Sequence, residues 1–214
     1  MNFRPLFRKL PTWAWVLIGA SVITVLFSAF PPQQDQTPPE LLPWNASYNA
    51  QGQLEALGLT VGQDTPQQAI DLYGHDFEVK LFSKKDEDNK TAEVFFPSIH
   101  ISSIHGAIAL RLKVPQEQLN HFYSEGVQTT VTKLGNREVT PHNEAIEILK
   151  QSPIQSVTLV PRKSLTERAI KMRFGEPERT EVQSDGVPHW FYPDKGLEII
   201  LNNEGPDALQ YYLF

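Results

Sequence analysis

The residues best suited to chemistry lie in the stretch Ser98-Ile99-His100-Ile101-Ser102-Ser103-Ile104-His105. In an extended strand, alternate side chains share a face, so Ser98, His100 and Ser102 would lie together. A hydroxyl beside an imidazole can act as a nucleophile pair, but the pair also needs an orienting acid and donors for an oxyanion. The spacing supplies neither, and we therefore predict no catalytic residue here.

His100 and His105 also raise the question of a metal site. Five residues apart, they share a face of neither a helix nor a strand. A loop between them could bring them together, with His75 or Asp76 as further ligands. We favour the simpler interpretation, that both histidines lie on the polar side of a sheet and its turn. A metal site at His100 and His105 is kept as the alternative.

The chain contains no nucleophile elbow, phosphate loop, dinucleotide fingerprint or His-Glu-x-x-His zinc pattern. It contains no cysteine, which rules out thiolate chemistry, disulfides and lipid attachment through a cysteine. The formal net charge of −6 argues against a nucleic-acid partner, which requires a basic surface. We therefore predict a protein that is not an enzyme and that carries no cofactor.

Aromatic side chains near the C-terminus are the candidates for a partner surface. In the run His189 to Tyr192, alternation puts Trp190 and Tyr192 on one strand face and Phe191 on the other. One of these faces is expected to belong to the core, and an aromatic set that stays exposed would bind a partner. The candidate partner surface comprises Trp190, Tyr192, Tyr211, Tyr212 and Phe214.

These residues must be positioned by short helices and strands. Thr65-Pro66-Gln67-Gln68 has the form of a capping box with proline in the first turn, and Gly74 ends the predicted helix. Alternating apolar residues predict strands at 77–81, 92–96 and 107–114. Further on we predict helices at 115–123, 140–149 and 164–174, and a hairpin joining 127–134 to 137–139. Residues 154–160 are expected to form a strand or an extended link, and strands are predicted at 180–183, 189–192, 197–201 and 208–213.

A short pattern recurs along the chain and suggests a duplication. Ala69-Ile70 precedes Tyr73-Gly74, and Ala169-Ile170 precedes Phe174-Gly175 about 100 residues later. The predicted fold class is α+β, with an N-terminal transmembrane helix followed by two small helix-on-antiparallel-sheet subdomains. The predicted parts are a cytoplasmic tail (1–11), the transmembrane helix (12–30), a Pro-rich linker (31–44), and the two subdomains (45–126 and 127–214).

The transmembrane prediction depends on an uncharged apolar run from Thr12 to Phe30. About 20 apolar residues in a helix span a bilayer. Three basic residues precede the run, so the N-terminus is expected in the cytoplasm and the rest of the chain in the periplasm. The length of the run favours an uncleaved anchor over a signal peptide. Phe27 favours it too, because it occupies a position where a cleavage site requires a small residue.

Small residues lie on one face of this predicted helix. Ala20, Thr24 and Ser28 follow one another at intervals of four, a spacing that lets two membrane helices approach closely. We name them as candidates for packing in the membrane. The alternative is that small residues, common in such helices, fall in register by chance.

The last fifty residues resemble a known family. Arg173-Phe174-Gly175-Glu176-Pro177, His189-Trp190-Phe191-Tyr192 and Gly196-Leu197-Glu198-Ile199 resemble the small outer-membrane assembly lipoproteins of the BamE type, which are similar to the repeated domains of the β-lactamase inhibitor protein. The resemblance implies helices on an antiparallel sheet, a bacterial envelope location and a role in holding other proteins. This chain departs from the family by lacking the lipidated cysteine and by its predicted second domain.

The expected function is an inner-membrane-anchored periplasmic binding or scaffolding protein without catalysis. Its expected partners are another envelope or inner-membrane protein and, through the N-terminal helix, the lipid bilayer. The alternative function is a periplasmic hydrolase or metal-dependent enzyme that uses His100 and His105.

Overall fold

The computed structural model describes residues 37–84, 88–131, 135–184 and 186–214, all within one compact unit. The helices are η1 (Pro39–Leu41), η2 (Pro43–Asn45), α2 (Pro66–Tyr73), α3 (Gln116–Ser124), α4 (Asn143–Leu149), α5 (Glu167–Phe174) and η3 (Pro193–Lys195). The strands are β1 (Ser47–Tyr48), β2 (Leu54–Ala56), β3 (Leu59–Thr60), β4 (Glu78–Ser83), β5 (Lys90–Ile101), β6 (Ile104–Leu112), β7 (Gln128–Val131), β8 (Arg137–Thr140), β9 (Ile154–Pro161), β10 (Arg179–Val182), β11 (Pro188–Tyr192), β12 (Leu197–Ile200) and β13 (Ala208–Tyr212).

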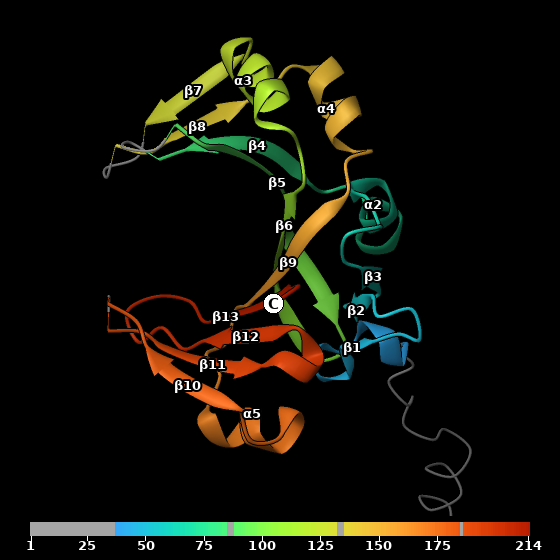
Figure 1. The fold of residues 1–214 in the computed structure, drawn as a ribbon, viewed down its shortest axis with the longest axis vertical. Helices are drawn as coiled ribbons and strands as arrows, with labels where there is room; N and C mark the ends of the chain where they lie inside the picture. The colour runs from blue at the N-terminus through green and yellow to red at the C-terminus, as the bar shows by residue number, and fades with distance from the viewer. Residues whose placement is uncertain (1–36, 85–87, 132–134, 185) are drawn as a thin grey trace, which may run out of the picture. The chain divides into compact units, whose positions relative to one another are not determined.

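One ten-stranded antiparallel sheet organises these elements (Figure 1). Its strand order is β10-β11-β12-β13-β9-β6-β5-β4-β8-β7, and β1 to β3 form a separate three-stranded sheet. Strand β9 lies between the strands of the N-terminal half and the four C-terminal strands, because it pairs with β6 on one side and with β13 on the other. The two halves of the chain therefore share a single sheet.

The core lies on one face of this sheet. Directly opposed residues point to the same face, and one such row is buried along its whole length: Val79, Val94, Leu110, Val157, Tyr211, Leu197 and Tyr192. Helices pack on this side, as shown by ring contacts of Tyr73 with Phe96 and of Phe174 with Tyr192. In Figure 1, α5 lies beside β10 and β11, while α3 and α4 lie near β7 and β8.

The local predictions for helices and strands are largely confirmed. Thr65 and Gln68 form the predicted capping box of α2, and Gly74, at a φ of 101°, ends the helix. The hairpin β7–β8 and the four C-terminal strands occur at the predicted positions, within one or two residues at most ends. Helix α5 starts later than predicted, because Thr166, whose hydroxyl accepts a hydrogen bond from the Ala169 N–H, is the N-cap in place of Ser164.

The predicted fold class is wrong in its architecture. In place of two small helix-on-sheet subdomains, the structure has a mostly β fold whose large sheet runs through both. The physical reason is β9, which hydrogen-bonds along both of its edges and so joins the strands of the two halves. The proposed boundary at residues 126 and 127 also separates β8 from β4, with which it pairs.

The transmembrane part of that architecture also requires correction. None of the helices among the described residues is long and apolar enough to cross a bilayer. The predicted helix at 12–30, with Ala20, Thr24 and Ser28, lies outside the described residues, as does the tail at 1–11. The membrane assignment therefore has no support from the fold.

Candidate functional site

The hairpin between β5 and β6 brings His100 and His105 together. They are direct cross-strand partners, and their ring centroids lie 4.3 Å apart in an edge-on arrangement. The turn contains Ser102, at a φ of 54°, and it places the two histidines side by side in spite of their spacing. Among the described residues, no group of three or more His, Cys, Asp or Glu side chains could hold a metal ion.

The C-terminal aromatic residues divide between the two faces of the sheet. Trp190, Tyr192 and Tyr211 are buried on the helix side, so they do not contribute an accessible surface. Tyr212 and Phe214 lie on the other side, where their ring centroids are 4.5 Å apart. Phe214 is 53% exposed. Two of the five residues of the predicted partner surface are therefore accessible.

The face of the large sheet opposite the helices, here called the open face, is a second candidate surface. Register places a continuous row of side chains across it: Glu78, Phe95, Ala109, Thr158, Gln210, Glu198, Phe191 and Arg179. This row alternates along each strand with the buried row of the core. Helices α2 and α5 contact the opposite, buried face through Tyr73 and Phe174.

The centre of the open face carries small side chains. Ala109 on β6 lies directly opposite Thr158 on β9, and Ala107 lies one pair further along the same strand. Phe95 borders this centre from β5 and is 38% exposed. Small residues beside an accessible aromatic ring give a partner room to approach the sheet closely and an apolar group to contact.

Charged pairs flank the small residues on the β4–β6 side. The Arg111 Nε atom lies 3.8 Å from the Glu93 Oε1 atom, and the Lys80 Nζ atom lies 3.2 Å from the Glu138 Oε1 atom. Burial raises the pKa of the Glu93 carboxyl, while the positive charge of Arg111 acts in the opposite direction. This side of the open face is therefore polar and of mixed charge.

A hydrogen-bonded group of three side chains flanks the other side. The Glu198 carboxylate contacts His189 Nδ1 through one oxygen and accepts a 2.8 Å hydrogen bond from the Tyr212 hydroxyl through the other. Burial and the neighbouring carboxylate raise the pKa of Tyr212. A carboxylate that orients an imidazole is one part of a general-base device.

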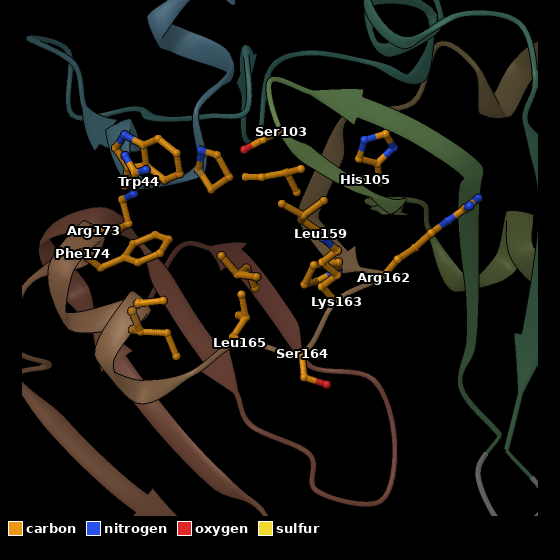
Figure 2. A pocket seen from close by; sticks show the side chains of 16 residues that line it. Trp44, Ser103, His105, Leu159, Arg162, Lys163, Ser164, Leu165, Arg173 and Phe174 are labelled. Carbon is orange, nitrogen blue, oxygen red and sulfur yellow. The ribbon is translucent and has the colours of Figure 1, made fainter.

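A pocket lies on the other side of the sheet, between α5, η2 and the β5–β6 turn (Figure 2). Its volume is about 460 Å³. The apolar lining comes from Ile104, Leu159, Leu165, Ile170, Phe174 and Leu209. In Figure 2, Trp44, Arg173 and Phe174 lie together at one end, and the Arg162 side chain extends away from them.

Local contacts fix the aromatic end of the pocket. The Arg173 guanidinium lies 4.4 Å from the centre of the Trp44 ring, and the Trp44 and Phe174 rings meet edge to face at 6.5 Å. Tyr192, on the adjacent strand, supports Phe174 and donates a 3.1 Å hydrogen bond to the Gly175 carbonyl. The buried Tyr211 donates a 2.8 Å hydrogen bond to the Pro43 carbonyl and so holds η2 in place.

Sequence reasoning did not identify this pocket. Pro43 and Trp44 fall in the segment predicted as a linker, yet Pro43 is buried and Trp44 contacts α5. The signal in the sequence is weak: a tryptophan in a Pro-rich stretch is unusual for a spacer, but it does not indicate its contact. His105 lines the pocket, which gives one predicted histidine a place in a cavity.

We compared the chain with family models, with curated proteins and with solved structures, and none of them matches.

Proposed function

We propose that this protein is a non-catalytic binding module that holds another protein of the bacterial cell envelope against the open face of its sheet. The supporting observation is the row of side chains that crosses the sheet from β4 to β10 on the face opposite the packed helices. Glu78, Phe95 and Arg179 in this row are exposed and the residues between them are part-exposed, except for Phe191, which is buried against Arg179 and Phe214. The envelope setting is supported by the resemblance of the last fifty residues to the BamE-type lipoproteins.

The side chains of the open face also indicate what the partner looks like. Acidic residues outnumber basic ones across this face: Glu78, Glu93, Glu138, Glu181 and Glu198 stand against Lys80, Arg111 and Arg179. Opposite charges across an interface guide association and fix its register. The partner is therefore expected to present basic side chains around a small apolar group that fits between Phe95 and the alanines of β6.

Added bulk at the centre of the open face tests this proposal. Ala109→Arg and Thr158→Arg would each place a long cation where a partner must approach closely. Met172→Arg is the matched control, because Met172 is 74% exposed on α5. The protein would be purified from its own cells after mild crosslinking, and captured proteins would be identified by mass spectrometry.

The proposal predicts a captured protein that is retained with Met172→Arg and lost with both open-face variants. Circular dichroism and unfolding midpoints would confirm that all three variants fold. Retention of the same partner by the open-face variants would overturn the proposal, as would loss through Met172→Arg alone.

A further inference from the structure

We propose that the pocket beside α5 binds a small amphiphilic carboxylate, an alkyl chain that ends in one carboxylate group. This site lies on the helix side of the sheet and is independent of partner docking on the open face. Its lining contains Arg162, Lys163 and Arg173, and no Asp or Glu is among its described lining residues. In a chain with a formal net charge of −6, this is a local reversal of charge.

The apolar interior fits the alkyl chain. A volume of about 460 Å³ lies within the usual range for small-ligand pockets, roughly 300–1,000 Å³. Ile170 and Leu209 are buried at its base, and Leu159 joins them from β9. Burial of apolar ligand surface against these side chains provides the main driving force for binding.

Arg173 fits the carboxylate. Stacking on Trp44 holds its guanidinium at one end of the pocket, and across the described residues no carboxylate pairs with it. A planar guanidinium presents two parallel N–H donors that match a carboxylate. Because the stack restricts this side chain before the ligand arrives, less conformational entropy is lost on binding.

The main chain at the mouth of the pocket favours an alkyl chain over a peptide. An extended peptide normally binds through backbone hydrogen bonds. Here the Arg162 N–H is bonded to the His105 carbonyl at 2.8 Å, and the Leu165 N–H to the Asp207 carboxylate at 2.6 Å. The Ala169 N–H is bonded to the Thr166 hydroxyl at 3.2 Å. These donors are therefore already satisfied.

Calorimetric titration of the full-length chain with decanoate tests this proposal. Decan-1-ol and decylamine are matched probes with the same chain and a neutral or positive end. Arg173→Gln removes the charge and keeps a shorter polar side chain, and Arg168→Gln is its control on the same helix, away from the pocket lining. Ala169→Phe fills the cavity from an exposed position on α5.

The proposal predicts that decanoate binds more tightly than either matched probe. Arg173→Gln should weaken decanoate binding by about tenfold or more, the loss expected for a charged hydrogen bond. Arg168→Gln should leave it unchanged, and Ala169→Phe should abolish it. Equal binding of decanol, no effect of Arg173→Gln, or binding of a leucine tripeptide but not decanoate would overturn the proposal. Partner capture by the same Arg173→Gln variant reports on the open face separately.

Discussion

The Tyr211 hydroxyl donates a hydrogen bond of 2.8 Å to the carbonyl oxygen of Pro43, 168 positions earlier in the chain. Tyr211 has no exposed surface, so this bond joins β13 to η2 inside the core. It places Pro43 and Trp44 at the pocket. The contact links a strand at the centre of the large sheet to a segment that has the composition of a spacer.

Replacement of Tyr211 by phenylalanine should destabilise the protein. The change leaves the buried Pro43 carbonyl without its partner, which costs about 1–3 kcal/mol in the free energy of unfolding. Tyr48→Phe is the control, because Tyr48 is 38% exposed and its substitution should change stability by less than about 0.5 kcal/mol. Urea unfolding measures both. Equal effects of the two substitutions would contradict the role given to the Pro43 bond.

Alkaline pH should destabilise the protein through its buried tyrosines. Burial raises the pKa of Tyr211 and Tyr73, and burial with help from Glu176 and Asp194 raises the pKa of Tyr192 to about 12. In the unfolded chain, tyrosine loses its proton near a pKa of about 10. The unfolded state therefore binds fewer protons above that pH, and the free energy of unfolding falls as the pH rises.

The stabilisation that the buried, neutral tyrosines provide is fully present below a pH of about 10 and declines towards a pH of about 12. Denaturant unfolding at a series of pH values would measure it, with tyrosinate absorbance followed in parallel. Tyr73→Phe should reduce the slope of stability against pH. A stability that stays constant across this range would show that these hydroxyl groups are not held in their neutral form by the fold.

Alanine at Gly196 should cost more than alanine at Gly186. Both glycines have positive φ values, 55° and 80°, so both substitutions carry backbone strain. A Cβ atom at Gly196 would also lie 2.4 Å from a Leu54 methyl carbon and 3.0 Å from the Tyr212 carbonyl oxygen, whereas a Cβ at Gly186 meets nothing within 4 Å. We expect an additional cost of about 1–3 kcal/mol at Gly196 by urea unfolding. Equal costs would mean that Leu54 can move aside freely.

A single sheet should unfold as one unit. Leu81→Ala, at the β4 end, and Ile199→Ala, on β12, each remove a fully buried side chain and should cost about 2–5 kcal/mol. Both variants should shift the same transition, observed by tryptophan fluorescence and by circular dichroism. Two transitions, each sensitive to one of the substitutions, would indicate that the halves fold independently in spite of β9.

Local signals in the sequence were sufficient for the individual elements. The capping box formed by Thr65 and Gln68 predicted the start of α2, and the strand candidates at 180–183, 189–192, 197–201 and 208–213 match the four strands after α5. These features depend on neighbours within a few residues, which a single sequence displays directly. The prediction of two separate sheets failed because the periodicity of β9 is the same whether the strand pairs within one subdomain or joins two.

The candidate sites depend on long-range contacts that periodicity does not encode. His100 and His105 meet because of a hairpin turn, and Trp44 meets Arg173 across more than half of the chain. Alternation predicted that Trp190 and Tyr192 share a face, but it did not predict that this face is the buried one. Trp190 and Tyr192 are buried because α5 packs on their side of the sheet. The open face is defined by the pairing register of the eight strands from β4 to β10, which periodicity within one strand does not reveal.

The most direct test of the account is site-specific photocrosslinking in cells. A photoreactive amino acid would replace Gln210 on the open face, and Met172 on α5 would be replaced in the control. The account predicts a crosslinked partner protein from position 210 and none from position 172. The absence of any crosslink from position 210 would contradict docking on the open face. A partner protein that is crosslinked from position 172 but not from position 210 would contradict it as well.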